Sequence, residues 1–200
     1  MGYANSIRNK ITNHSRRPDK LLQILLESIS SYLPSSDKAF IKKAYEYGAL
    51  AHKDQTRLSG EPYICHPLCV AQILANMQMD KQTISAALLH DVIEDTTITL
   101  NDIENNFDTE IASLVDSVSK LDQIKFYNKA EAQAETFRKM ILAMVKDMRV
   151  ILIKLTDRLH NMRTLEYLPE NKKKLKAKET LDIYAPIANR LGINEIKNEL

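Results

Sequence analysis

Four polar residues that could do chemistry follow directly on an apolar run, in the order His90, Asp91, Glu94 and Asp95. If this segment is helical, His90 lies one turn before Glu94, and Asp91 lies one turn before Asp95. The four side chains would then form a compact polar cluster at the end of a buried helix. Imidazole together with carboxylate suits a divalent ion such as manganese, iron or zinc. Because a His-Asp pair alone is common, a metal site needs support from elsewhere in the chain.

A second polar face occurs further along the chain. Asp157, Asn161 and Thr164 are spaced i, i+4 and i+7, which places them on one face of a helix that is otherwise apolar. Burying a carboxylate without a partner is costly, so Asp157 needs a metal ion or a cation nearby. An ion pair with Arg158 or Arg163 is the alternative, but Arg158 points about 100° away from Asp157 on a helix.

His66 is a further candidate, because it immediately precedes Pro67 at the start of a predicted helix with an apolar face. Taken alone, such a histidine also fits a helix-capping or core position. Cys65 and Cys69 offer a competing site, in which both thiolates and His66 would bind a structural zinc ion. Their adjacent and i+4 spacing, without a second cysteine pair, does not fit tetrahedral zinc well. We therefore expect the cysteines to belong to the core.

The composition is that of a soluble globule without a strong bias. Of 200 residues, 44% are hydrophobic and 27% are charged, and the formal net charge is +2. A nucleic-acid-binding domain usually carries a concentrated basic field, so this balance argues against direct nucleic-acid binding. No segment approaches the roughly twenty apolar residues of a membrane span, and the N-terminus lacks a secretory signal. The two cysteines form no disulfide framework, and we expect a cytoplasmic protein with reduced thiols.

The elements that must position these residues are predicted to be helices. Only four glycines and six prolines interrupt the chain, and apolar residues recur at helical spacing. Helices are expected at about 21–29, 40–49, 67–79, 81–89, 99–107, 109–121, 130–148, 150–162 and 172–191, with a loop at 54–62 and a kink at Pro186. Residues 150–153 alone would suit a buried strand, but the apolar pattern continues without a breaker. The predicted fold class is all-α, with a flexible basic lead over residues 1–20.

Taken together, these segments resemble the N-terminal hydrolase domain of the RelA/SpoT family, which belongs to the HD phosphohydrolases. The resemblance begins near residue 39 and rests on four blocks that occur in order. They are QTRLSGEPYICHP (residues 55–67), LHDVIEDT (89–96), KLTDRLHNMRT (154–164) and AKETLDIYAPIANRLG (177–192). The resemblance implies an HD-domain helical bundle over residues 21–192. We expect residues 193–200 to begin a linker or helix toward a synthetase domain that is absent here.

The resemblance also implies a role for each candidate residue. It assigns a Mn²⁺ ion to His66, His90, Asp91 and Asp157, and catalysis to the carboxylates of Glu94 and Asp95. It assigns the binding of the guanine nucleotide to Arg57, Ser59, Tyr63, Asn161 and Thr164. One departure is visible, because a second basic residue usually follows the arginine, whereas Leu58 stands at that position in this chain.

The activity implied is metal-dependent hydrolysis of the 3′-pyrophosphate of (p)ppGpp, the alarmone of the stringent response, to GDP or GTP and pyrophosphate. A divalent cation lowers the pKa of a water molecule, and Glu94 and Asp95 would handle its protons, with the acid and the base left unassigned. The partners would be the synthetase and regulatory domains of a longer protein. Two alternatives are a catalytically silent nucleotide-binding regulatory module and a stand-alone hydrolase of alarmones or NADPH. All six metal-binding and carboxylate positions are retained, which argues against a catalytically silent module.

Overall fold

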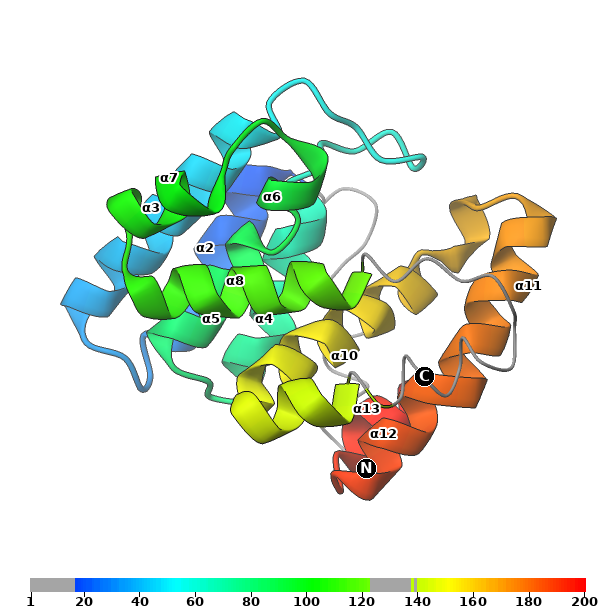
Figure 1. Cartoon of the computed structure of the whole chain (residues 1–200). Coiled ribbons are helices and arrows are strands. Elements are labelled where there is room, and N and C mark those ends of the chain that lie inside the picture. Colours follow the sequence, from blue (N-terminus) through cyan, green and yellow to red (C-terminus); the bar gives the residue numbers. More distant parts are fainter. Residues whose placement is uncertain (1–16, 123–137, 139) are drawn as a thin grey trace.

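The computed structural model describes residues 17–122, 138 and 140–200, and within them it contains helices and no β-strand. The helices are α2 (Pro18–Ile29), α3 (Ser35–Ala51), α4 (Cys65–Asn76), α5 (Lys81–Leu89), α6 (Val92–Asp95), α7 (Leu100–Asn106), α8 (Thr109–Asp122), α10 (Met148–Arg163), α11 (Glu170–Glu179), α12 (Ala185–Arg190) and α13 (Asn194–Glu199). A 3-10 turn, η2 (Leu165–Tyr167), and a π-helical turn, η3 (Thr180–Tyr184), flank α11. The all-α prediction is confirmed, and the helices pack around one core (Figure 1). None of these helices is long and apolar enough to span a membrane.

α2 packs against α4, and α3 packs against α5, on one side of the bundle. In α2, Leu21, Leu25 and Ile29 recur at intervals of four and are buried as a stripe. The helix begins at Pro18, a residue favoured in the first turn because its missing N–H needs no partner there. α2 therefore starts within the segment that we predict as a flexible lead, and residues 1–16 of that prediction lie outside the described residues.

α5 carries the apolar run that precedes the polar cluster. Asp80 caps its start, because the Asp80 side chain accepts a hydrogen bond from the backbone N–H of Thr83 at 2.7 Å. Every residue from Thr83 to Leu89 is buried. α3 approaches α5 closely at Gly48, where a Cβ atom would lie 2.9 Å from the Leu88 carbonyl oxygen. The absence of a side chain at Gly48 therefore sets how closely the two helices pack.

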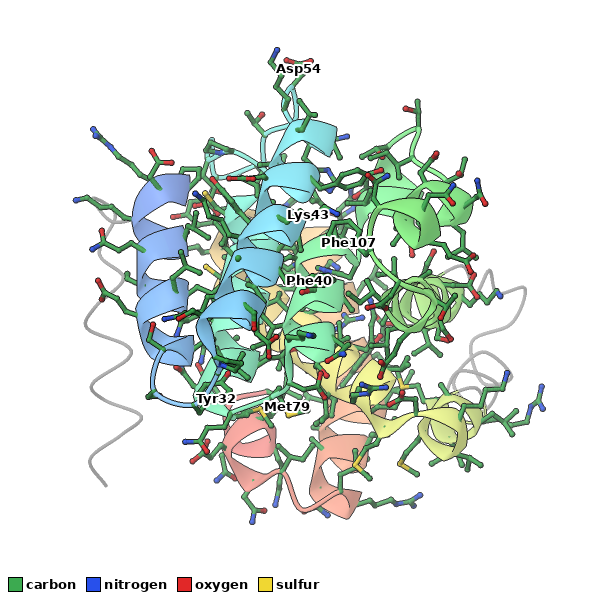
Figure 2. All side chains as sticks on the ribbon, turned by 90° about the vertical axis from the view of Figure 1, so that its left-hand side faces the viewer. Tyr32, Phe40, Lys43, Asp54, Met79 and Phe107 are labelled. Carbon is green, nitrogen blue, oxygen red and sulfur yellow. The ribbon has the colours of Figure 1, made fainter. Side chains whose placement is uncertain are left out.

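Aromatic side chains attach the end of α7 to α3 (Figure 2). α7 begins with a capping box, in which Thr99 and Asp102 each accept the backbone N–H of the other. Phe107, which directly follows α7, packs edge-on against Phe40 and Tyr47 of α3, with ring centroids 5.8 and 5.4 Å away. The capping box and the aromatic contacts together anchor the chain that follows the polar cluster.

α10 is a single buried helix. Asp147 caps its start and accepts a hydrogen bond from the backbone N–H of Arg149. All residues from Val150 to His160 are buried, so the prediction of a helix rather than a strand is confirmed. This run includes charged side chains, which need partners inside the protein. Most of the helix predicted at 130–148 lies outside the described residues, and residues 140–146 are helical.

The helix predicted at 172–191 is divided into three pieces. α11 ends at Glu179, η3 follows, and α12 begins at Ala185 with Pro186 in its first turn. Proline has no N–H to donate within a helix, and the wider π-helical turn before it absorbs the break in the hydrogen-bond ladder. The chain therefore departs from a regular α-helix next to the proline at which we predict the kink.

Residues 193–200 include α13, which packs against α12 and α10. Ile196 of α13 is buried. Arg163, at the end of α10, donates two hydrogen bonds of 2.6 Å to the Glu199 carboxylate. This segment is thus attached to the helix that carries Asp157.

Candidate metal centre and nucleotide cleft

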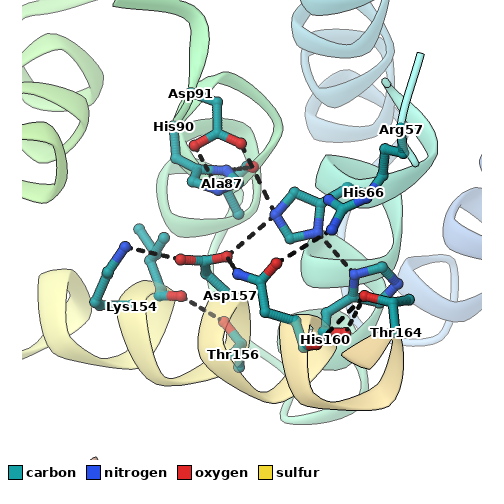
Figure 3. Close-up of polar contacts among 12 residues, drawn as sticks. Arg57, His66, Ala87, His90, Asp91, Lys154, Thr156, Asp157, His160 and Thr164 are labelled. Carbon is teal, nitrogen blue, oxygen red and sulfur yellow. Dashed lines mark hydrogen bonds and ion pairs between the residues drawn. The ribbon is translucent and has the colours of Figure 1, made fainter. Parts of the chain in front are cut away.

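Three potential metal ligands meet where α4, α5 and α10 come together (Figure 3). His66 lies in the first turn of α4, His90 directly follows α5, and Asp157 lies within α10. Each residue is buried and offers one ligand atom, and these atoms all lie within 4.8 Å of one another. This spacing lets a single divalent cation bind all three. Cysteine has no part in the cluster formed by the described residues.

One ring nitrogen of His90 has no hydrogen-bond partner among the described residues. Its Nδ1–H donates a hydrogen bond to the Ala87 carbonyl oxygen at 2.8 Å, which leaves the lone pair on Nε2. Asp91 Oδ1 lies 3.1 Å from Nε2 without forming a hydrogen bond, and Nε2 is buried. Burial lowers the pKa of His90. The nearby charges of Asp91 and Asp157 and the hydrogen bond to Ala87 outweigh burial, so the pKa of His90 lies above its ordinary value. A cation bound at Nε2 would satisfy this buried atom.

His66 links the cluster to a second buried histidine. Its Nε2 is 3.1 Å from Asp157 Oδ1 and 3.8 Å from Asp91 Oδ2. Its Nδ1 is 2.7 Å from Nδ1 of His160, which follows Asp157 on α10. With Nε2 as ligand atom, the Nδ1–H of His66 donates to His160, and this outer contact fixes the ring orientation. Burial holds the pKa of His160 well below its ordinary value and also lowers the pKa of His66.

Asp157 is a buried carboxylate with donors on both oxygens. Lys154 Nζ contacts Oδ2 at 2.8 Å, and the Asn161 side-chain amide donates to Oδ1 at 2.5 Å. Burial raises the pKa of Asp157, but Lys154 and His66 lower it more strongly, so the pKa lies well below the ordinary value. Asp157 is therefore ionised at neutral pH and can act as an anionic ligand.

The two arginines near Asp157 have other partners. Arg158 pairs with Glu179 of α11 at 2.8 Å, and its guanidinium lies over the Tyr184 ring. Arg163 pairs with Glu199 of α13 at 2.6 Å. The ion pairs considered as alternatives for Asp157 are thus not formed, and its cationic neighbour is Lys154.

The Tyr63 hydroxyl joins Asp91 and Asp95. Its oxygen lies 2.8 Å from Asp91 Oδ2 and 2.7 Å from Asp95 Oδ2. Burial and the nearby carboxylates raise the pKa of Tyr63, so the hydroxyl stays protonated. A turn at His90 and Asp91 separates α5 from α6, so the helical arrangement considered for residues 90–95 holds only in part. The Asp95 N–H still donates to the Asp91 carbonyl oxygen at 2.9 Å, which keeps the two carboxylates one turn apart.

A cleft of about 470 Å³ opens beside the metal centre. Its volume lies in the range of about 300–1,000 Å³ that is typical of small-molecule sites. It is lined by Thr56, Arg57, Leu58, Ser59, Tyr63, His66, Asp91, Glu94, Lys154, Asp157, Asn161, Thr164, Tyr167, Leu168 and Lys176. All predicted site residues are in this lining except His90 and Asp95, which contact the lining residues Asp91 and Tyr63 respectively.

Arg57 connects the 54–62 loop to α10. Its Nη2 donates to Asn161 Oδ1 at 3.1 Å, and the Asn161 amide in turn donates to Asp157. The Ser59 hydroxyl oxygen is buried and has no hydrogen-bond partner among the described residues. Leu58, at the position where the family resemblance leads us to expect a basic residue, is 70% exposed. The loop thus brings the Arg57 guanidinium and the Ser59 hydroxyl to the cleft.

Three further residues at the site, Lys154, His160 and Lys176, are not among the site residues predicted from the sequence. Lys154 precedes Asp157 by three residues on a helix, and this spacing is a signal for an ion pair. His160 follows Asp157 by three residues, and this spacing is a signal that the two side chains lie on the same face of the helix. Lys176 lies among several lysines of α11, and its sequence neighbourhood does not distinguish it from them.

A sequence model described as HD domain matches residues 44–194. The chain belongs to the HD domain family. Membership implies a divalent metal ion, and the cluster of His66, His90 and Asp157 supplies suitable ligands for it. The candidate ligands for this ion meet where α4, α5 and α10 come together.

Curated relatives of this HD domain confirm the resemblance to the RelA/SpoT hydrolase domain. It is 57% identical over 180 residues to the "Bifunctional (p)ppGpp synthase/hydrolase SpoT" of Escherichia coli strain K12, covering 90% of this chain and 26% of that protein. It is 54% identical, with the same two coverages, to the "Guanosine-3′,5′-bis(diphosphate) 3′-pyrophosphohydrolase" of Vibrio cholerae serotype O1. The chain thus spans about a quarter of the length of these relatives.

A solved structure with a similar fold comes from work titled "A metazoan ortholog of SpoT hydrolyzes ppGpp and plays a role in starvation responses". The two structures align with a TM-score of 0.59 and 29% sequence identity. The alignment covers 75% of this chain and 86% of the other. The HD-domain helical bundle that we predict is therefore confirmed.

Proposed function

We propose that this HD domain hydrolyses the 3′-pyrophosphate of (p)ppGpp and releases GDP or GTP together with pyrophosphate. The observation that carries the proposal is that two members of the metal-ligand cluster, the Glu94 carboxylate and the Arg57–Asn161 pair all border one cleft. The relatives named as (p)ppGpp hydrolases support the same substrate. We further propose that the domain acts in the cytoplasm as part of a longer protein with synthetase and regulatory domains, as the lengths of these relatives suggest.

The proposed metal ion is Mn²⁺, bound by His66, His90, Asp91 and Asp157. Imidazole nitrogen and carboxylate oxygen form a donor set that suits this ion. The ion would lower the pKa of a water molecule and screen the charge of the phosphates. The outer contacts prepare the ligands, since His90 is oriented by Ala87 and His66 by His160.

Glu94 and Asp95 are the proposed acid–base pair. Water attacks the phosphorus that is bonded to the ribose 3′-oxygen, the bond from that phosphorus to the 3′-oxygen breaks, and pyrophosphate carries the new oxygen. Glu94 lines the cleft, and one carboxylate of the pair would accept a proton from the water while the other would donate one, with the two roles left unassigned. Asp95 is held by Tyr63, so Tyr63 serves to position the carboxylates as well as to border the cleft. A proton returns to the departing 3′-oxygen.

Arg57, Ser59, Asn161 and Thr164 are the proposed contacts of the guanine nucleotide. Arg57 supplies a planar cation that suits a base face or a phosphate. Ser59 supplies a hydroxyl that has no partner within the described residues. Asn161 accepts a hydrogen bond from Arg57 and donates one to the proposed metal ligand Asp157. A nucleotide that contacts Asn161 would therefore also affect the orientation of the Asp157 carboxylate.

The test is an assay of pyrophosphate release from ppGpp with Mn²⁺ present and after removal of metal by a chelator. We expect turnover with Mn²⁺, none after chelation, and recovery when Mn²⁺ is restored. A parallel assay with NADPH distinguishes a hydrolase of broader substrate range. Full activity in protein shown to be metal-free by elemental analysis would contradict the proposal. A metal-loaded protein that binds ppGpp without turnover would instead indicate a silent regulatory module.

A further inference from the structure

Lys176 is a cleft-lining residue with no assigned role. It belongs to α11, whereas the proposed metal ligands come from α4, α10 and the end of α5. Several other lysines of α11 are exposed, but Lys176 is half-buried against the cleft. Its position therefore differs from that of an ordinary surface lysine.

The acidic groups near Lys176 are already paired with other cations. Asp157 contacts Lys154 at 2.8 Å, and Glu179 contacts Arg158 at 2.8 Å. Lys176 itself forms no ion pair with any residue of the described chain. These side chains therefore comprise three cations and two anions, and a divalent ion on Asp157 would increase the excess of positive charge.

The surroundings of the Lys176 ammonium disfavour an unpaired charge. Burial lowers the pKa of Lys176, the nearby Arg158 lowers it further, and Asp157 and Glu179 only partly oppose this. A half-buried ammonium with an excess of neighbouring cations is stabilised when an anion binds to it. The cleft therefore offers a site for an anionic group of a bound molecule.

We propose that Lys176 binds the terminal phosphate of the 3′-pyrophosphate, an inference that rests on the proposed function. Hydrolysis requires the phosphorus next to the ribose to lie at the metal centre. Lys176 lines the same cleft as Asp157 and Lys154, yet it belongs to a different element from the ligands. The phosphate that is joined to the reacting one through the bridging oxygen is the group that such a position suits. Lys176 thereby favours a 3′-pyrophosphate over a 3′-monophosphate.

The test compares Lys176→Met with Lys178→Met in the Mn²⁺-loaded protein. Methionine keeps an unbranched chain and removes the charge, and Lys178 is an exposed residue of the same helix outside the cleft lining. Binding of inorganic pyrophosphate is measured by calorimetry and by competitive inhibition of ppGpp hydrolysis. Loss of a charge-assisted hydrogen bond should weaken pyrophosphate binding roughly ten- to hundredfold in Lys176→Met. Lys178→Met should bind as the wild type does.

Binding of GDP, which lacks the 3′-pyrophosphate, provides the second measurement. We expect both variants to bind GDP as the wild type does, with unchanged metal content and melting temperature. Lys176→Gln keeps a polar end on the half-buried chain and should show the same loss of pyrophosphate binding. Wild-type pyrophosphate affinity in Lys176→Met, or a loss confined to GDP, would overturn the inference. Pyrophosphate binding needs no turnover, so a wild type that fails to hydrolyse ppGpp would refute the proposed function separately.

Discussion

Each candidate ligand in the metal centre is oriented by a contact outside the cluster. His90 is held by the Ala87 carbonyl, His66 by His160, and Asp157 by Lys154 together with the Asn161 amide. Such outer contacts fix ring orientation and ligand charge, and their loss typically lowers metal affinity by about 10–100-fold. The roles of individual residues can therefore be separated by measuring metal content and turnover independently.

Asp157→Asn is expected to lose the metal ion. The neutral amide is a poorer ligand for a divalent cation, and it leaves Lys154 without its anionic partner. The loss of metal affinity should exceed the roughly 10–100-fold attributed to an outer contact. Elemental analysis after dialysis measures the effect. Full metal content in this variant would remove Asp157 from the ligand set.

Glu94→Gln is expected to keep the metal ion and lose turnover. The change is nearly isosteric, and Glu94 lines the cleft without belonging to the ligand cluster. Removal of general acid–base help typically lowers the rate by about 10²–10⁴-fold. Metal stoichiometry, ppGpp affinity and turnover should be measured on the same preparation. Turnover near that of the wild type would mean that Glu94 only solvates the end of the short helix α6.

Arg57→Ala is expected to raise the Michaelis constant for ppGpp with metal content unchanged. Arg57 contacts Asn161 but none of the proposed ligands. Asn161→Ala should differ, because its amide donates directly to Asp157, and metal affinity should fall together with substrate affinity. Titration of metal into both apo variants gives the comparison. Equal metal affinities in the two variants would contradict this division of roles.

Residue types and spacing singled out part of the candidate ligand cluster. His90 and Asp157 stood out because they follow or interrupt apolar helical segments, whereas His66 joined them through the family resemblance, and the structure brings the three together. The partners of these residues were harder to predict, because the contact of His66 with His160 joins α4 to α10 and depends on tertiary packing. The position of Tyr63 between Asp91 and Asp95 depends in the same way on how the loop folds back.

At the scale of elements, close packing of α3 on α5 positions the end of α5 from which His90 follows. Gly48→Ala is expected to destabilise the protein, because the new Cβ would lie 2.9 Å from the Leu88 carbonyl oxygen, a backbone atom. Overpacking of a core typically costs about 1–3 kcal/mol, which outweighs the gain of up to about 1 kcal/mol in helix propensity. Urea denaturation measures the change. Leu50→Ala, at an exposed position of α3, is the control and should have little effect.

The boundaries of elements were less predictable than their existence. The α5 helix was expected at 81–89 and is found at Lys81–Leu89, because an apolar run between Asp80 and His90 marks both ends. The turn that separates α5 from α6 contains no glycine or proline, so the sequence does not indicate it. The π-helical turn before Pro186 likewise follows from packing as well as from the proline, so a kink was predictable and its form was not.

At the scale of the whole molecule, the buried histidines link the stability of the metal-free protein to pH. The folded-state pKa of His160 lies well below its unfolded value of about 6.5, so the unfolded state binds more protons below that pH. Its contribution is therefore complete above about pH 6.5 and is lost as the pH falls. His90, with a raised pKa, acts in the opposite sense, since its contribution is complete below that pH and fades as the pH rises.

We expect the free energy of unfolding of the chelator-treated protein to fall between pH 7.5 and pH 5 less steeply in His160→Gln than in the wild type. Glutamine keeps a polar group beside His66 and does not titrate in this range. Urea denaturation at a series of pH values gives both slopes. Identical slopes would show that His160 does not carry the pH dependence. Asp157 also contributes to the free energy of unfolding, but outside this pH range. Its pKa is lowered, so its contribution is lost only in strong acid.

The three ligand-bearing segments are far apart in the chain, since His66 and Asp157 are separated by about 90 residues. A cation that joins them acts on the unfolded chain as a reversible cross-link that closes a long loop. Closing a long loop removes more chain entropy than closing a short one, although the dependence on length is shallow. His66 and Asp157 line the cleft, so a chelator can remove this link without separating the helices, and the metal-free protein should unfold at a lower urea concentration than the metal-loaded protein.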